Sequence, residues 1–274
     1  MAKDAGAPGA ADTWANGQSY EAYVGRWSRP VAREFLTWLA LPPDRRWLDI
    51  GCGTGALSDI ILHDWLPKSV TGLDSSEGYI TFARQNLQDP RAAFQVGSVE
   101  SLPFSEGAFD AAVSGLVLNF LPHTDRAVAE MRRVVAPGGA VAAYVWDYAG
   151  DMEFMRYFWD AAVALDPKAA ALDEGRRFPL CHPEPMMHLF TLAGLQKVET
   201  RAIDVSTVFH DFEDFWSPFL GGQGPAPTYL ASLSPERRNE LREELLGQLP
   251  IEDDGSIHLN ARAWAVKGQQ ARKT

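Results

Sequence analysis

The sequence has little of three features that mark particular classes of protein. Only two cysteines, Cys52 and Cys181, occur in 274 residues, so structural disulfides are not expected and a reducing compartment fits. No apolar run approaches the roughly 18 residues that a membrane-spanning helix needs. Residues 1–16 also lack the hydrophobic stretch of a signal peptide. These absences predict a cytoplasmic protein without a membrane span.

Basic residues are scarce as well. Lysine and arginine together number 25 against 36 acidic residues, which gives a formal net charge of −11. Proteins that bind nucleic acid neutralise phosphates with basic patches, and adjacent basic residues occur here only as isolated pairs, such as Arg272-Lys273. The composition therefore argues against nucleic acid as a partner.

A glycine-rich turn at residues 47–55, WLDIGCGTG, is the most informative feature that the sequence does contain. A short apolar strand carries Asp49 near its end and is followed by Gly51, Gly53 and Gly55, and then by the apolar residues of a helix. Glycine takes positive φ freely, and its missing side chain lets a ligand approach the backbone. The pattern predicts a nucleoside cofactor at the edge of a parallel sheet.

A second acidic residue, Asp74, ends the next predicted strand, residues 69–74. A carboxylate accepts two hydrogen bonds from a ribose diol, so an acid here suits a nucleoside cofactor. However, Gly51-x-Gly53-x-x-Ala56 with an acid roughly 20 residues later also fits the dinucleotide fingerprint of nicotinamide oxidoreductases. These two motifs alone leave both cofactor classes open.

The segments that follow favour one of the two classes. Residues 94–104 read as a strand and a Leu-Pro-Phe turn, and residues 109–114 read as a fourth strand. Residues 127–147 read as a helix to Val135, a turn and a fifth strand. Together with the glycine-rich turn, these motifs resemble class I S-adenosylmethionine (SAM) methyltransferases, in particular small-molecule enzymes of the ubiquinone and menaquinone type. The resemblance implies SAM as cofactor and S-adenosylhomocysteine (SAH) as product.

The alternation of strands and helices predicts an α/β fold with a doubly wound, mostly parallel sheet. The resemblance implies seven strands, with the last, residues 256–266, antiparallel and beside the sixth, residues 195–208. A first helical region is expected from about residue 19 to residue 39. The expected organisation is a disordered leader, a single methyltransferase domain and a tail, at residues 1–18, 19–267 and 268–274.

Two cap insertions, at about residues 148–190 and 209–250, are expected in this domain. Ligands of open parallel sheets lie beyond the carboxyl ends of the strands, so both insertions are expected to cap the substrate cavity. Their aromatic residues as a group favour an apolar acceptor. A single one of them, such as Phe158 or Phe212, is better explained by packing in the core of the cap.

The resemblance also implies which residues hold the cofactor. Asp49 is expected near the methionine ammonium, and Asp74 is expected on the ribose hydroxyls. Arg26, from a helix that similar proteins fold over the cofactor, is assigned equally to the methionine carboxylate or to a surface ion pair. The full set of expected cofactor contacts is Tyr20, Arg26, Asp49, Gly51, Cys52, Gly53, Thr54, Gly55, Asp74, Ser75, Ser98, Val99, Glu100, Leu116 and Val117.

Ser98 departs from the family pattern. The family usually carries aspartate here, which accepts a hydrogen bond from the adenine amino group. A serine hydroxyl also accepts but has no charge, so weaker adenine recognition is expected. The Val99 amide is expected to donate to the ring, and Glu100 is an alternative acceptor.

Methyl transfer from a sulfonium depends largely on holding the nucleophile in line and dry. A general base is needed only if the nucleophile carries a proton that must leave early. Asp147, at the end of the fifth strand, and His182, in the first insertion, are candidates for such a base. The spacing around Cys181 and His188 matches no metal site, and no metal is expected.

The predicted function is transfer of a methyl group from SAM to a small, largely apolar acceptor. Three alternatives remain at this stage. The first is a protein of the same fold that binds SAM or a metabolite without transferring a methyl group. The second is a nicotinamide oxidoreductase, and the third is a methyltransferase that acts on proteins.

Overall fold

A seven-stranded sheet in the order β3-β2-β1-β4-β5-β7-β6 organises the protein. The computed structural model describes residues 26–221 and 224–272. The first five strands are parallel, whereas β7 is antiparallel to both of its neighbours. The predicted fold class is therefore confirmed. The strands are β1 (Arg46–Ile50), β2 (Ser69–Asp74), β3 (Ala92–Val96), β4 (Phe109–Gly115), β5 (Val135–Trp146), β6 (Gln196–Phe209) and β7 (Ile257–Gln269).

Helices cover both faces of this sheet. Crossovers between parallel strands are right-handed, so the helices between β1 and β3 lie on the face opposite to α5. On the first face α2 packs against α3, and on the second α5 packs against α8. The helices of the sheet are α2 (Arg26–Leu39), α3 (Ala56–Asp64), α4 (Glu77–Asn86), η2 (Leu118–Phe120), α5 (Thr124–Val134) and α8 (Pro183–Leu192).

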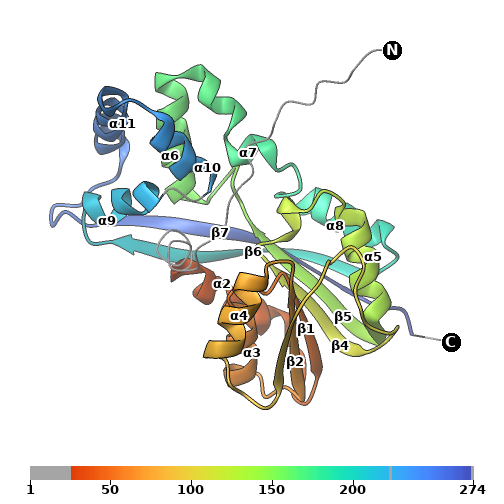
Figure 1. Cartoon of the computed structure of the whole chain (residues 1–274). Helices are drawn as coiled ribbons and strands as arrows, with labels where there is room; N and C mark the ends of the chain where they lie inside the picture. Colours follow the sequence, from red (N-terminus) through yellow and green to blue (C-terminus); the bar gives the residue numbers. More distant parts are fainter. Residues whose placement is uncertain (1–25, 222–223, 273–274) are drawn as a thin grey trace, which may run out of the picture.

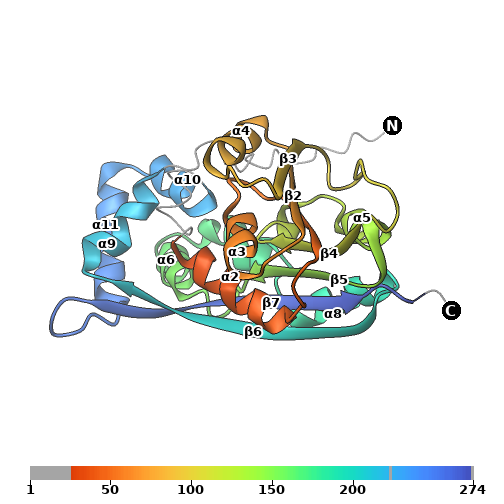
Figure 2. The ribbon, with the colours of Figure 1, turned by 90° about the horizontal axis from the view of Figure 1, so that it is seen from below.

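The remaining helices form a cap on the β6–β7 ribbon. The pairing of β5 with β7 ends at Trp146↔Ala263, but β6 and β7 stay paired as far as Phe209↔Ile257. The ribbon therefore runs past the end of β5, and Figures 1 and 2 show the cap helices gathered along this extension. The cap helices are α6 (Glu153–Leu165), η3 (Pro167–Ala171), α7 (Glu174–Arg177), α9 (Phe212–Trp216), η4 (Ser217–Gly221), α10 (Pro225–Ser232) and α11 (Pro235–Gln248).

Aromatic side chains fill the core of this cap. Phe219 stacks on Phe154 and on Phe158, with ring centroids 4.4 and 4.5 Å apart, and all three rings are fully buried. Such ring pairs add roughly 0.5–1.5 kcal/mol each to the effect of burial. Phe215 joins the same cluster. These aromatic residues hold the two insertions together because each insertion supplies part of the cluster.

Two element boundaries differ from the sequence expectation. The fifth helix ends at Val134 and the strand begins at Val135, so the predicted turn at residues 136–139 lies inside β5. Val135 pairs with Phe109 before the register shifts, which makes this segment a bulge. Gly139 allows it, because a Cβ there would lie 2.6 Å from the Asp110 carbonyl oxygen. At the other end, β7 continues to Gln269.

Candidate cofactor and acceptor site

A cavity of about 190 Å³ lies at the carboxyl ends of β1, β2, β4 and β5. This is where ligands bind in open α/β sheets, and its size suits small molecules. Its lining residues come from the glycine-rich turn, the ends of four strands, α2, α3, α4, η2 and the first insertion. They are Ser28, Ala32, Asp49, Gly51, Cys52, Gly53, Thr54, Ala56, Leu57, Asp74, Tyr79, Gly115, Leu116, Val117, Phe120, Tyr144, Trp146, Tyr148, Met155 and Glu174.

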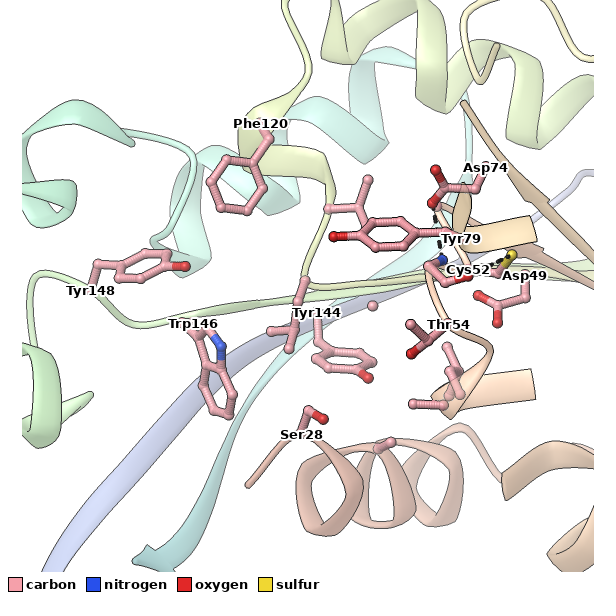
Figure 3. A pocket seen from close by; sticks show the side chains of 18 of the residues that line it. Ser28, Asp49, Cys52, Thr54, Asp74, Tyr79, Phe120, Tyr144, Trp146 and Tyr148 are labelled. Atoms are coloured by element: carbon pink, nitrogen blue, oxygen red, sulfur yellow. Dashed lines mark hydrogen bonds between the residues drawn. The ribbon is translucent and has the colours of Figure 1, made fainter. Parts of the chain in front are cut away.

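The lining divides into two ends. Figure 3 shows Asp49 and Asp74 on one side of the cavity. Phe120, Trp146 and Tyr148 lie on the other side. The first end carries the predicted cofactor motifs, and the second is mostly aromatic.

The glycine-rich turn adopts backbone conformations that its sequence predicts. Gly51 and Gly53 have φ of 66° and 52°, in the left-handed region that favours glycine. A Cβ at Gly51 would lie 2.6 Å from the Val117 side chain, whereas a Cβ at Gly53 would meet nothing within 4 Å. Because Gly53 lines the cavity, that open space is room for a ligand to approach the backbone.

The Asp74 carboxylate, at the end of β2, is hydrogen-bonded to the glycine-rich turn. Its Oδ2 accepts a hydrogen bond from the Gly53 amide at 3.0 Å, and its Oδ1 accepts one from the Ser76 amide at 2.8 Å. An ionised carboxylate has about four acceptor positions. Asp74 is thus fixed in orientation and keeps acceptor capacity for a ribose diol.

Asp49 is a fully buried carboxyl group in the same end of the cavity. Ser58 Oγ donates to its Oδ2 at 2.7 Å, which orients the side chain. Burial raises the pKa of Asp49 to about 7; the Ser58 hydrogen bonds oppose this rise and the charge of Asp74 adds to it. A cation bound beside Asp49 would favour its ionised form, so a methionine ammonium fits this position.

The structure brings many of the expected cofactor contacts together, but not all of them. Asp49, Gly51, Cys52, Gly53, Thr54, Asp74, Leu116 and Val117 line the cavity. Gly55, Ser75, Ser98, Val99 and Glu100 are not among its lining residues. Gly55 precedes α3 in the left-handed conformation. Tyr20 lies outside the described residues, and so does the side chain of Arg26, although its backbone begins α2.

The loop that carries Ser98 lies beside Asp74 but opens to solvent. The Gly97 amide donates to the Asp74 carbonyl oxygen at 2.9 Å, which places the loop next to β2. Ser98 is exposed, and its Oγ accepts from the Glu100 amide at 3.3 Å. The adenine contacts expected from this loop stay a prediction.

Several lining residues were not expected from the sequence. Tyr79, in the first turns of α4, has its pKa raised by burial and by the charge of Asp74, and its ring lies beside Asp74 in Figure 3. Tyr144 and Trp146 alternate along β5, so the two-residue period of strands could have placed both on one face. Gly115 makes room for Tyr144, because a Cβ there would lie 2.5 Å from its hydroxyl oxygen.

The candidates for a general base lie elsewhere. The Asp147 carboxylate accepts from the Asp151 amide at 3.0 Å and so caps the turn that follows β5. His182 is the half-buried residue that precedes α8. Neither of them is among the lining residues.

Glu174 is the acid that the structure places in the aromatic end of the cavity instead. It is 2% exposed, and Trp159 Nε1 donates a hydrogen bond to its Oε2. Burial raises the pKa of Glu174 to about 8, which the hydrogen bonds from its own backbone and from Trp159 oppose. No sequence motif marked this residue, because its neighbours read as an exposed, charged helix.

The two insertions contribute differently to the cavity. Tyr148, Met155 and Glu174 come from the first insertion, and the described residues of the second, 209–221 and 224–250, supply none of the lining. The second insertion instead packs against α6 through α10 and α11. Only the first insertion therefore forms a wall of this cavity, and the second supports that wall.

Comparison with known proteins shows which proteins this chain resembles. A family profile described as a methyltransferase domain matches residues 48–143. This segment spans the glycine-rich turn, Asp74 and the strands through most of β5. Residues 48–143 of the chain are thus similar to a methyltransferase domain, and the match favours the SAM interpretation of the glycine-rich turn over the dinucleotide one.

Alignments with individual relatives cover only part of each chain. Trans-aconitate 2-methyltransferase of Variovorax paradoxus is 28% identical over 128 residues, which are 47% of this chain and 48% of that protein. Demethylmenaquinone methyltransferase of Desulfitobacterium hafniense is 37% identical over 106 residues, or 37% and 42% of the two chains. The chain thus spans less than half the length of these curated relatives.

Solved structures share the fold over more of the chain. Phosphoethanolamine N-methyltransferase 2 of Haemonchus contortus, in complex with SAM, gives a TM-score of 0.58 at 17% identity. The alignment covers 93% of this chain and 56% of that one. The cyclase SpnF gives 0.52 at 19% identity, over 90% and 81% of the two chains. These likenesses concern the fold.

Within the described residues, no helix is both long and apolar enough to cross a membrane.

Proposed function

We propose that this protein transfers a methyl group from SAM to a small, largely apolar acceptor. The observation that carries the proposal is that one cavity joins a glycine-rich, acidic end to an aromatic end. Bound SAM would supply a methyl group activated by a positively charged sulfur. The residues of this chain would supply binding, orientation and a site that excludes water.

The first end of the cavity fits each part of the cofactor. The open space beside Gly53 admits the ligand to the backbone, and Asp74 has acceptor capacity for the ribose hydroxyls. Asp49 offers the methionine ammonium a buried carboxyl group, which becomes fully ionised beside a cation. Tyr79 adds an aromatic ring beside Asp74.

The second end supports an apolar acceptor. Phe120, Tyr144, Trp146, Tyr148 and Met155 form most of its surface, and ligand pockets lined in this way bind mainly by apolar contact. The named relatives include enzymes for small molecules, such as demethylmenaquinone. We also propose the cytoplasm as the location, because both cysteines are free and buried, as in proteins of reducing compartments.

One alternative has a specific observation in its favour. The cyclase SpnF shares this fold over most of both chains, so the fold does not by itself require methyl transfer. A protein of this kind would bind SAM or SAH without consuming SAM.

The test is calorimetric binding of SAM, SAH and NADH, followed by turnover of tritiated SAM with a panel of apolar phenols and amines. We expect micromolar binding of SAM and SAH, no binding of NADH, and labelled organic product. Asp74→Asn should weaken SAM binding roughly 100-fold, because hydrogen bonds to a charged group contribute roughly 1.5–3 kcal/mol each. Asp253→Asn, at an exposed position remote from the cavity, is the matched control.

Two outcomes would count against the proposal. Tight binding of NADH without binding of SAM would favour an oxidoreductase. Binding of SAM and SAH with no loss of label to any member of the panel, or to added protein, would favour the alternative represented by the cyclase.

A further inference from the structure

Glu174 is a buried carboxyl group whose surroundings give it no evident structural purpose as a charge. It is the first residue of α7, it lines the aromatic end of the cavity, and it is 2% exposed. Burying an acid among aromatic groups is unfavourable unless the acid is paired or used. Its side chain accepts a hydrogen bond from an uncharged indole, that of Trp159, so folding alone does not account for a carboxyl group here.

The neighbours of Glu174 hold it firmly in place. Asp173 precedes α7 and accepts hydrogen bonds from both terminal nitrogens of Arg156, at 2.8 and 3.1 Å. Arg156 also donates to the Tyr148 carbonyl oxygen at 3.0 Å, so α6, α7 and the end of β5 are linked. A Cβ at Gly175 would lie 2.8 Å from both the Arg156 guanidinium and that carbonyl oxygen. This close packing fixes the carboxyl group at the wall of the cavity.

A hydrogen-bond donor occupies the same end of the cavity. Trp146 is 2% exposed, and within the described residues its Nε1 is buried with no hydrogen-bond partner. Figure 3 shows its ring between Tyr144 and Tyr148. A buried donor without a partner is costly, which points to a ligand atom that accepts this hydrogen bond.

We infer that the carboxyl group of Glu174 accepts the proton of a hydroxyl group on the methyl acceptor. This inference rests on the proposed function. One lone pair of the acceptor oxygen forms the new bond to the methyl carbon while the carbon–sulfur bond breaks and sulfur keeps the electron pair. The O–H bond breaks, and its proton passes to the Glu174 carboxylate. The products are a methyl ether, SAH and neutral Glu174, which then returns its proton to solvent.

Two features select a hydroxyl group over other nucleophiles. A hydroxyl oxygen has two lone pairs, so one can accept from Trp146 while the other attacks, whereas a neutral amine has a single lone pair. An acceptor that carries a carboxylate at this end would meet the like charge of ionised Glu174. The acceptor class is therefore an apolar alcohol or phenol.

Burial is the main cause of the raised pKa of Glu174, and nearby charges modify it. Asp173 raises its pKa and Arg177 lowers it, while Arg156 is engaged by Asp173. Cys181, in the segment before α8, is also close enough that the charge of Glu174 contributes to raising the pKa of its buried thiol. With a pKa of about 8, Glu174 is mostly protonated at pH 7 in the free protein. A sulfonium placed beside it would ionise it, which prepares the base only when the methyl donor is present.

The experiment counts the protons released when SAM and SAH bind, by calorimetry at pH 7 in buffers of different ionisation enthalpy. The two ligands differ by the methyl group and the sulfonium charge, so a contribution from Asp49 beside the shared ammonium cancels in the difference. Wild type should release about half a proton or more in excess with SAM. Glu174→Gln should abolish this excess, and the exposed control Glu184→Gln should keep it.

The outcomes separate the inference from the proposed function. An unchanged proton excess in Glu174→Gln, with both ligands bound, would overturn the role of Glu174 alone. Failure of wild type to bind either ligand would overturn the proposed function. Glutamine should preserve the fold, because its amide oxygen can accept from Trp159, and thermal unfolding checks this.

A second variant keeps the carboxyl group and changes its environment. Trp159→Phe removes a hydrogen bond that lowers the pKa of Glu174, so the SAM-dependent proton excess should extend to higher pH. An unchanged pH dependence would contradict the role of Glu174.

A kinetic comparison tests the acceptor class with 4-propylphenol, 4-propylaniline and 4-propylbenzoate as probes. The phenol should be methylated fastest, and Glu174→Gln should lower its kcat roughly 100-fold or more without changing the Kd for SAH, which lacks the sulfonium. Faster methylation of the benzoate than of the phenol would overturn the assignment of a hydroxyl acceptor.

Discussion

The two ends of the cavity differ in how the chain builds them. The cofactor end comes mainly from two short segments, residues 49–57 and 74–79, in which each residue is placed by its neighbours in sequence. The acceptor end gathers single side chains from η2, β5, α6 and α7. Local backbone chemistry therefore defines the first end, and packing between distant segments defines the second.

The two buried acids show the same contrast. Asp49 lies in a strand and is oriented by Ser58, nine residues further along the chain. Glu174 is oriented by Trp159 on another helix, and its helix is held through the pairing of Arg156 with Asp173. The surroundings of Asp49 can be predicted from a sequence motif. The surroundings of Glu174 form only when the cap has packed.

The largest effect that would test this comparison is expected in the core of the cap. Phe219→Ala removes a ring stacked on Phe154 and Phe158 and should lower the free energy of unfolding by roughly 3–5 kcal/mol. Because Phe219 does not line the cavity, the Kd for SAM should change less than about twofold. Urea unfolding and calorimetry measure the two quantities.

Leu220→Ala is the matched control for this change, since Leu220 is 60% exposed and adjacent in sequence. It should leave both quantities nearly unchanged. A tenfold loss of SAM affinity in folded Phe219→Ala would show that the cap and the cofactor end are coupled.

A smaller effect is expected at the glycine-rich turn. Gly53→Ala introduces a Cβ at a φ of 52°, directed into the open space of the cavity, and should weaken SAM binding roughly tenfold. Gly247→Ala in α11 also adds a Cβ that meets nothing within 4 Å, but in a helix, where alanine is favoured. This control should be more stable by up to about 1 kcal/mol, with unchanged binding. Equal affinities of the two variants would refute the proposed role of the turn.

The smallest effect is expected in the pH dependence of SAM binding. The pKa of Asp49 is raised to about 7 in the free protein, and a bound ammonium requires the ionised form. Acidification therefore weakens binding, by about fourfold between pH 8 and pH 6.5 for a single group of this pKa. Titration calorimetry of SAH isolates this group, since SAH lacks the sulfonium.

Asp49→Asn should remove this pH dependence, and Asp253→Asn should retain it. If wild-type affinity for SAH rises as the pH falls, Asp49 does not hold the ammonium.

Sequence reasoning succeeded where a structural requirement is local. Gly51 and Gly53 have the positive φ that a tight strand-to-helix turn demands, and Asp74 closes on that turn through the Gly53 amide. The alternation of elements predicted a doubly wound, mostly parallel sheet, which the structure confirms. In these places a residue and its near neighbours already contain the physical reason for the geometry.

The same reasoning failed where contacts between distant segments determine the position of a side chain. Asp147 was expected at the edge of the site because it follows β5, but its carboxylate turns to the Asp151 amide. The expected packing of Phe158 and Phe212 in the core of the cap is confirmed, since both are buried, whereas the positions of Tyr144 and Trp146 in the cavity wall were not predicted. The sequence does not say which aromatic side chains pack against one another and which face a cavity.

By itself, the sequence determined the sheet, the glycine-rich turn and the two acids of the cofactor end, because periodicity and backbone conformation are properties of short segments. Only the tertiary structure decided that the first insertion forms the wall of the cavity, with the second packed behind it. It also decided that Glu174 is buried in the lining of the same cavity as Trp146. Burial is a property of the assembled fold, and the raised pKa of Glu174 arises from burial.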